Sequence, residues 1–312
     1  MRIEKDALGE MPLPDGAYYG IQAFRSLSNF DVTDKTFNDY PAVVRALAEI
    51  KKACALANRD IGALGADKAG AIARACDDIL EGRMEGQFPV NIWRGGGTSI
   101  NMNLNEVIAN RANELLTGHK GYEQVHPNTH VNMCQSSNDV YPTAENIVLY
   151  RETGRALEGV AALENSFARK SKEFGGVVRL GRTCLQDGVP MTLGQVFAGF
   201  HGVIRRSRER LEALREGFRV GVLGGTVIGT GLGVLPGYVE AVYPHLSAIV
   251  GFEMRLPDTP EGSPVSDAGL FDAMQNADGL LTLSGALKVL ACSAGKIAND
   301  FRMLSSGPRS GF

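Results

Sequence analysis

The chain has 312 residues, of which 44% are hydrophobic and 21% are charged, and its formal net charge is −3. This composition is typical of a folded globular protein and excludes an intrinsically disordered chain. The 32 basic and 35 acidic residues are well mixed, so the charge pattern predicts no nucleic-acid partner and no membrane-surface partner. A chain of this size is expected to form two domains, or one domain and part of another.

The beginning of the chain and its cysteines indicate a cytoplasmic protein. Met1 is followed by the charged stretch RIEKD, which argues against a cleavable signal peptide. No apolar run approaches the roughly 18 residues that a membrane span needs. The cysteines are odd in number and form no CxxC pair, which favours reduced thiols over disulfides or a zinc site. They are Cys54, Cys76, Cys134, Cys184 and Cys292.

In chain order, an irregular start precedes a series of helices. Residues 1–40 carry proline and glycine punctuation and are expected to be irregular. Helical patterns follow at 41–60 and 66–84, and another helix is expected to begin after the glycine-rich turn WRGGGTS. The later helices are predicted to be much longer, at about 138–174 and 188–220 and again near the end of the chain.

The long helices carry the apolar spacing of a helical bundle. Apolar residues recur at alternating spacings of four and three, which is the seam of a coiled-coil-like helix that faces a partner along its length. The two clearest series are Leu193, Phe197, Phe200, Ile204, Ser207, Leu211, Leu214, Phe218, and Leu283, Leu287, Leu290, Ala294, Ile297, Phe301, Leu304. We therefore predict a mainly α fold, with a smaller mixed helical domain at 1–137 and a long-helix bundle at 138–312.

Polar donors are concentrated at the predicted start of one helix. The glycines at 95–97 precede Thr98 and Ser99, and glycines ahead of a helix let backbone N–H groups converge on a phosphate or carboxylate. The alternative is an ordinary helix cap on a flexible loop, which is the commoner arrangement for such a segment alone. No GK[ST] follows the glycines, so the segment is not a P-loop.

Two further polar segments follow, at 135–139 and 181–187. The first has the sequence QSSND, and a helix cap explains one of its side chains but not the whole run. The second places Thr183 in a polar turn before the 188–220 helix, where simple turn chemistry is the alternative explanation. If these helices start at one end of a bundle, the segments gather donors around a small dianion.

The remaining candidate residues give weaker signals. His126 and His130 are separated by a proline, and without an HExxH motif or a third ligand no metal site is expected. Cys184 has no identifiable local base and is interpreted as a structural thiol. The glycine-rich stretch at 224–233 does not match GxGxxG, so no dinucleotide or other cofactor is expected.

Five ordered blocks of the sequence resemble the aspartase/fumarase superfamily, and the resemblance covers essentially the whole chain. The blocks are GTSINMNLNEVIANRA, HVNMCQSSNDVYPTA, GRTCLQDGVPMTLGQ, GGTVIGTGLG and KIANDFRMLSSGPRSG. Within the superfamily AYYG, QFPV and LQD are similar to aspartate ammonia-lyases. Trp93, and His126 in the HPN element where fumarases have a second anion site, are similar to fumarases, although Thr129 replaces the acidic residue expected there.

The resemblance implies reversible anti-elimination of ammonia from L-aspartate to fumarate through an aci-carboxylate dianion. It implies that a small dicarboxylate is bound by Thr98, Ser99, Ser136, Ser137, Asn138 and Thr183, with His126, Asn128 and Cys184 as further candidates. Cys184 stands where fumarases carry a catalytic histidine, which argues against a hydratase. Fumarate hydratase and a non-catalytic fragment with the lyase fold remain the alternatives.

The resemblance also predicts which parts of a complete superfamily enzyme are not found in residues 1–312. In the superfamily the base is a serine on a loop of pattern GSSxMPxKxN that follows soon after SSGPR, whereas this sequence ends at Phe312. The base, the last bundle helices and the small C-terminal domain are therefore expected to be absent, and the chain is expected to have little activity alone. A homotetramer is implied, in which each active site draws segments from three chains.

Overall fold

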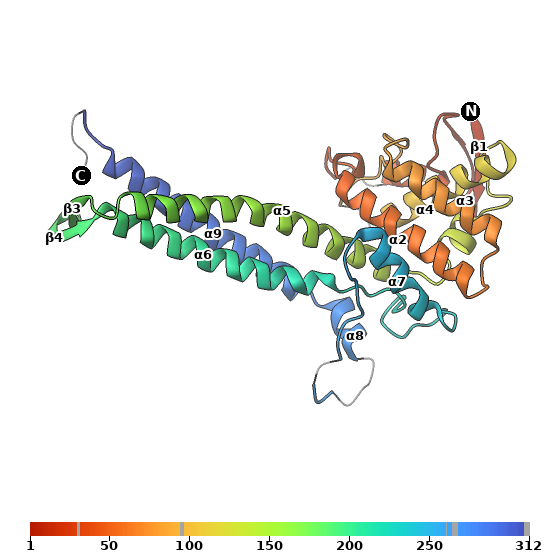
Figure 1. The fold of residues 1–312 in the computed structure, drawn as a ribbon. Helices are drawn as coiled ribbons and strands as arrows, with labels where there is room; N and C mark the ends of the chain where they lie inside the picture. The colour runs from red at the N-terminus through yellow and green to blue at the C-terminus, as the bar shows by residue number, and fades with distance from the viewer. Residues whose placement is uncertain (30–31, 94–96, 260, 264–267, 309–312) are drawn as a thin grey trace. The chain divides into compact units, whose positions relative to one another are not determined.

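The computed structural model describes residues 1–29, 32–93, 97–259, 261–263 and 268–308 and is mainly helical (Figure 1). It divides into two compact units. Unit 1 comprises Met1–Val148 and Arg219–Asn276, and unit 2 comprises Leu149–Phe218 and Ala277–Phe312. The expectation of a mainly α fold is confirmed.

Unit 1 begins with regular structure where the sequence predicted an irregular start. Strands β1 (Arg2–Asp6) and β2 (Gly9–Leu13) pair as an antiparallel hairpin, followed by α1 (Ile21–Asn29) and η1 (Phe37–Asp39). Buried Glu4 accepts a hydrogen bond from the Ile21 backbone N–H at 2.8 Å and so fixes the hairpin to the start of α1. The expectation was wrong because such a polar contact leaves no hydrophobic periodicity in the sequence.

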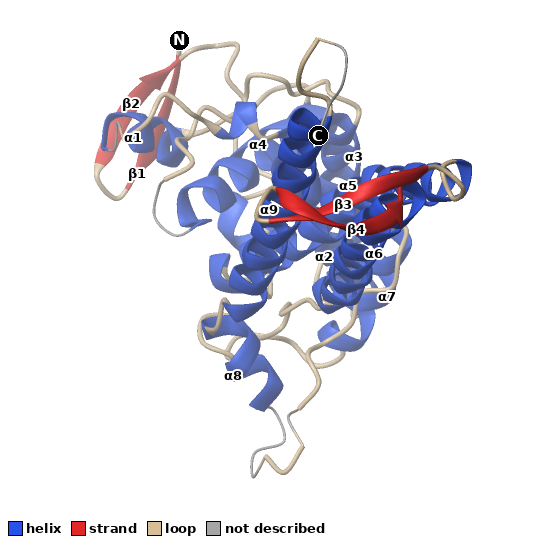
Figure 2. Cartoon of the chain, turned by 90° about the vertical axis from the view of Figure 1, so that its left-hand side faces the viewer, coloured by secondary structure: helices blue, strands red, loops and turns tan. Residues whose placement is uncertain are grey.

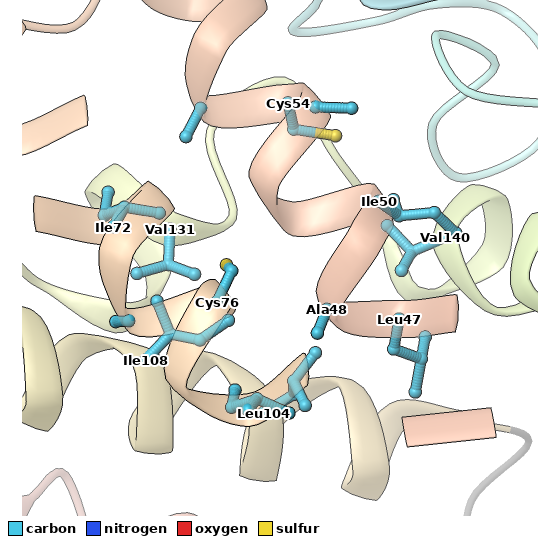
Figure 3. Packing of buried hydrophobic residues seen from close by; sticks show 14 of the residues in the cluster. Leu47, Ala48, Ile50, Cys54, Ile72, Cys76, Leu104, Ile108, Val131 and Val140 are labelled. Atoms are coloured by element: carbon cyan, nitrogen blue, oxygen red, sulfur yellow. The ribbon is translucent and has the colours of Figure 1, made fainter. Parts of the chain in front are cut away.

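The core of unit 1 is built from the helices that the sequence predicted most clearly. They are α2 (Pro41–Asp60), α3 (Ala66–Leu80) and α4 (Thr98–Thr117), and η3 (Pro127–Val131) and α7 (Tyr238–Val250) add further side chains to the same core. Helix α8 (Ala268–Gln275) also belongs to unit 1. Side chains from α2, α3 and α4 meet Val131 and Val140 in the centre of this core (Figure 3). Burial of such apolar surface is the main force that holds the unit together.

Unit 2 contains the bundle, in which α6 (Leu193–Glu216), α9 (Asp278–Leu304) and the later part of α5 (Ser137–Glu173) lie side by side (Figures 1 and 2). The four–three seam of α6 is confirmed, because all its buried residues except Gly194 belong to the predicted series. These are Phe200, Ile204, Ser207 and Leu211, and Phe218 of the series is buried just after the helix. In α9 the seam shifts at one position, where Ala286 is buried and Leu287 remains 41% exposed.

The start of α6 differs from the expected 188–220 span. Residues Gln186–Thr192 form β4, which pairs antiparallel with β3 (Val178–Thr183), as Figure 2 shows in red. The helix begins only at Leu193, after a capping box in which Thr192 and Gln195 exchange side-chain-to-backbone hydrogen bonds. It is followed by η4 (Gly217–Arg219).

Helix α9 corrects one expectation about apolar runs. Within the part of the chain that the structure describes, it is the one helix long and apolar enough to cross a membrane by length and composition. Core helices of soluble bundles can pass the same test, and Leu283, Ala286 and Ile297 of α9 are packed in the core of unit 2. The finding therefore leaves the bundle fold unchanged.

The limits of the two compact units differ from those of the predicted domains at 1–137 and 138–312. Residues 219–276, expected in the bundle, are part of unit 1. Helix α7 packs against α2, and its fully buried Tyr238 donates a hydrogen bond from its hydroxyl to the Cys54 sulfur at 3.1 Å. The predicted domain limits stay a prediction.

We expect the core of unit 1 to be sensitive to single truncations. Leu104→Ala removes a side chain that is 0% exposed and should lower the free energy of unfolding by about 2–5 kcal/mol through lost burial and a cavity. Leu116→Ala, on the same helix but 41% exposed, is the matched control and should cost much less. Urea unfolding followed by circular dichroism measures both, and equal losses would contradict this description of the core.

Candidate functional site

The starts of α4 and α5 lie against each other within unit 1. Gly95 and Gly96 lie outside the described residues, whereas Gly97 precedes α4 with a φ of 92°. A Cβ at Gly97 would lie 2.6 Å from the Tyr141 ring, so glycine is required both by φ and by this close approach. The contact brings Thr98 to the first turns of α5. Thr98 is exposed and Ser99 is partly buried.

The neighbouring serines at the start of α5 have different roles. Ser136 caps the helix, because its Oγ accepts from the Asn138 N–H at 3.2 Å and its own N–H donates to Asp139 Oδ1 at 2.9 Å. Ser137 Oγ accepts from Asn101 Nδ2 at 3.1 Å. Because both hydroxyl oxygens act as acceptors in these contacts, the O–H groups of Ser136 and Ser137 can still donate to a ligand.

Asn138 and Asp139 connect this helix start to the glycine-rich stretch at 224–233. Asp139 Oδ2 accepts from the Thr226 N–H at 3.0 Å, and Asn138 Nδ2 donates to the Val227 carbonyl at 2.8 Å. Asp139 is fully buried, and burial raises the pKa of its carboxyl to about 7. The glycine-rich stretch at 224–233 therefore holds the start of α5 in place through these two hydrogen bonds.

A buried lysine that the sequence analysis missed lies under the same segment. Lys51 of α2 is 0% exposed, and its Nζ donates to Asn132 Oδ1 at 2.9 Å and to Gln135 Oε1 at 2.8 Å. Burial lowers the pKa of its ammonium to about 8. The available signal was its position on the apolar stripe of α2, four residues after Leu47 and three before Cys54.

Asn132 is the centre of this polar cluster. Its Oδ1 accepts three hydrogen bonds, from Lys51 Nζ at 2.9 Å and from the amides of Asn101 and Asn105, each at 3.2 Å. The two asparagines belong to α4 and are almost fully buried. The cluster therefore joins α2, α4 and the turn before α5 through polar contacts inside the core.

His126 and His130 contact backbone groups near them in the chain, and His130 Nε2 also lies 3.1 Å from Lys68 Nζ. His126 Nδ1 accepts from the backbone N–H groups of Asn128 and Thr129 at 3.2 and 3.3 Å, and so caps η3. His130 Nδ1 accepts from the His126 N–H at 2.8 Å. Among the residues that the structure describes, no group of three or more His, Cys, Asp or Glu side chains converges as a metal site would require.

Thr183 and Cys184 belong to unit 2, whereas the other predicted donors belong to unit 1. Thr183 ends β3 and pairs with Gln186 of β4, so it lies in a hairpin and not directly before a helix as expected. The tip consists of Cys184 and Leu185, with φ angles of 49° and 64°. Such backbone is unfavourable for residues other than glycine and often marks a functional position. Both Thr183 and Cys184 are exposed.

The donors of unit 1 are suited to an oxygen anion. The N-termini of α4 and α5 carry partial positive charge, and hydroxyls of Thr98, Ser99 and Ser137 add hydrogen-bond donors beside them. Thr98 is exposed and Ser99 is partly exposed, so solvent and a ligand can reach both residues. This set can bind a carboxylate and stabilise negative charge that develops on it.

Comparison with known proteins shows one family. A family model described as "Lyase" matches residues 9–312. The chain is 42% identical to an aspartate ammonia-lyase of Bacillus sp and 43% identical to a class II fumarate hydratase of Ralstonia nicotianae, over 100% and 99% of its length. The whole chain spans only 64% and 65% of these two relatives.

Solved structures give the same picture. A fumarate lyase:delta crystallin from Brucella melitensis, bound to cobalt, superimposes with a TM-score of 0.92 at 45% identity, and covers 99% of this chain and 66% of its own. A class II fumarase from Schistosoma mansoni gives a TM-score of 0.88 at 35% identity, with the same coverage. The fold of this chain is thus the fold of these lyases.

We expect the backbone at the hairpin tip to store strain that glycine relieves. Leu185→Gly should raise the free energy of unfolding by about 0.5–1 kcal/mol, because φ of 64° is costly for leucine and Leu185 is 57% exposed. Leu180→Gly, in the paired part of β3, is the control and should lower it. Thermal unfolding measures both, and destabilisation by Leu185→Gly would contradict the strain.

Proposed function

This chain belongs to the lyase family that includes aspartate ammonia-lyases and class II fumarate hydratases, and we propose that it serves the reversible elimination of ammonia from L-aspartate to give fumarate. The observation that carries the proposal is the meeting of two helix starts in unit 1, where Gly97 lies against Tyr141 and Asn101 contacts Ser137. The donors gathered there fit one carboxylate of a small dicarboxylate. The proposal involves no cofactor and no resident metal.

The hydrogen-bond donors act on the proton-abstraction step of such an elimination. Removal of the proton beside a carboxylate places a second negative charge on that group and gives an aci-carboxylate dianion. Preorganised hydroxyls and helix N-termini stabilise this charge more than they stabilise the substrate, which lowers the barrier. We assign this role to Thr98, Ser99, Ser136, Ser137 and Asn138, and Ser136 also caps the helix through its Oγ.

Overall identity does not separate the two kinds of relative, because it is 42% to one and 43% to the other. The choice of aspartate over malate therefore rests on individual residues. Cys184 occupies the position at which fumarases carry a catalytic histidine. Thr129 replaces the acidic residue of the fumarase HPN element. Fumarate hydratase remains the alternative, supported by Trp93 and His126, and a non-catalytic protein with the lyase fold is the second alternative.

The proposal places the remaining parts of the site in an oligomer. Thr183 would bind substrate from unit 2. In a homotetramer three chains would contribute segments to each active site, as in the aspartase/fumarase superfamily. The exposed apolar side chains of α9, such as Leu281 at 76% and Val289 at 48%, support the need for a covering surface. We propose a cytoplasmic enzyme, and we assign no catalytic base among these residues.

We expect fumarate to bind at the donors of unit 1. Ser137→Ala should weaken fumarate binding roughly tenfold, because it removes a hydrogen bond to a charged group. Ser166→Ala is the matched control, since Ser166 lies on α5 with its hydroxyl bound to the Ala162 carbonyl and outside the donor set. Calorimetric titration with fumarate measures both, and unchanged affinity of the Ser137 variant would count against this placement of the ligand.

The reaction is tested by comparing two substrates. Incubation of the protein with L-aspartate and with L-malate should give more fumarate from L-aspartate, followed by proton NMR so that slow turnover suffices. More fumarate from L-malate would replace the proposal by the hydratase alternative. Binding of fumarate without any turnover of either substrate would support the non-catalytic alternative.

A further inference from the structure

We propose that Lys51 is a positioning residue for the dicarboxylate site, holding the turn at 132–135 so that Ser137 presents its hydroxyl to the ligand, and adding positive charge beneath the donors. The inference deepens the proposed function and rests on it. It concerns a residue that does not need to touch the ligand.

Burial makes a purely structural lysine an expensive choice at this position. Lys51 is 0% exposed, and transfer of an ammonium from water costs several kcal/mol unless partners compensate for it. Its recorded hydrogen bonds go to two neutral amide oxygens, with no carboxylate at hydrogen-bond distance among the described residues. A methionine would fill a similar volume without this cost, so the charge itself calls for an explanation.

The ammonium sets the orientation of two side-chain amides. Because an ammonium can only donate, it draws the oxygens of Asn132 and Gln135 toward itself, and their NH2 groups must point away. Asn132 Nδ2 then donates to the Gln135 carbonyl at 3.1 Å, and Gln135 Nε2 donates to the carbonyls of Val131 and Met133, each at 3.0 Å. A single buried charge thus fixes both ends of the turn that leads into Ser136.

The same orientation is passed on to a ligand-binding hydroxyl. Asn132 Oδ1 accepts from Asn101 Nδ2 at 3.2 Å, and the same Nδ2 donates to Ser137 Oγ at 3.1 Å. Ser137 is therefore an acceptor toward the core, so its own proton is free to point outward to a ligand. Asn101 Oδ1 is buried and has no hydrogen-bond partner among the residues that the structure describes, which is the cost of holding the amide in this orientation.

The charged and titratable groups around Lys51 predict a pH signature. They are Cys54 on the same helix, Cys76 on α3 and Asp139 on α5. Burial raises the pKa of both thiols, so they stay neutral near pH 8, and Asp139, with a pKa raised to about 7, is already charged there. Lys51, with a pKa lowered to about 8, is then the group that loses positive charge as the pH rises from 7.5 to about 9.

The experiment measures fumarate affinity of the whole chain between pH 7.5 and 9.5 by calorimetry. Fumarate stays a dianion throughout, because carboxyl pKa values lie near about 4. We expect the wild-type affinity to fall several-fold across this range. Lys51→Met should bind roughly tenfold or more weakly at pH 7.5 and show a flat pH profile. Lys52→Met, which removes a neighbouring charge paired with Asp77 at 2.6 Å, is the matched control and should bind like the wild type.

The outcomes separate the inference from the function on which it rests. No fumarate binding by the wild type would overturn the proposed function itself. Wild-type binding with a flat pH profile, or with a Lys51→Met variant of equal affinity, would overturn the role of Lys51 alone. If Lys51→Met fails to fold by circular dichroism, the wild-type pH profile decides the matter, since a purely structural lysine would not make affinity fall near pH 8.

Discussion

The hydrogen bonds between Lys51 and the turn at 132–135 are the contact on which the candidate site depends. They connect the middle of α2 to a segment 81 residues later in the chain, and they lie inside the core of unit 1, beside other buried polar side chains such as Asn101 and Asn105. A salt bridge or hydrogen bond in such a place is strong, because the surrounding dielectric is low and water cannot compete. The same environment makes any loss of a partner costly, so the turn has little freedom to change shape.

Helix α4 continues this polar design along its length. Its buried asparagines hold the loops around unit 1, since Asn110 Nδ2 donates to the Tyr18 carbonyl at 3.0 Å and Asn113 Nδ2 to the Val125 carbonyl at 2.7 Å. Glu106, also on α4, accepts backbone N–H groups at the start of α1, including Gly20 at 2.9 Å and Ala23 at 3.0 Å. One helix therefore holds two segments by hydrogen bonds, the one that leads into α1 and the loop before η3, and it presents Thr98 and Ser99 at its N-terminus.

Unit 2 is built on a different principle. Its core is a seam of apolar residues along α5, α6 and α9, with Phe167, Phe200 and Phe301 in mutual ring contact. Such packing needs few specific polar contacts. The hairpin that carries Thr183 and Cys184 is exposed and lies outside this core. The strained tip of that hairpin is the part of unit 2 whose backbone is least explained by packing.

Most helices and all three polar segments could be predicted from the amino-acid sequence. Apolar spacing located α2, α5 and α9 closely, and the run of donors at 135–139 marked the start of α5, because both signals lie within a few turns of chain. The resemblance of five ordered blocks also identified the family correctly. The predicted start of α6 was too early, because Gly188 and Pro190 are unfavourable in a helix and residues 186–192 pair instead as a strand of a hairpin.

The hydrogen-bond partners of these segments became known only from the tertiary structure. It showed that Ser136 is a cap, that Asp139 binds the stretch containing Thr226, and that Thr183 belongs to another compact unit. It also revealed Lys51, whose partners are more than 80 residues away along the chain. Hydrogen bonds at such separations depend on how helices pack, and packing is not encoded in any local pattern of residues.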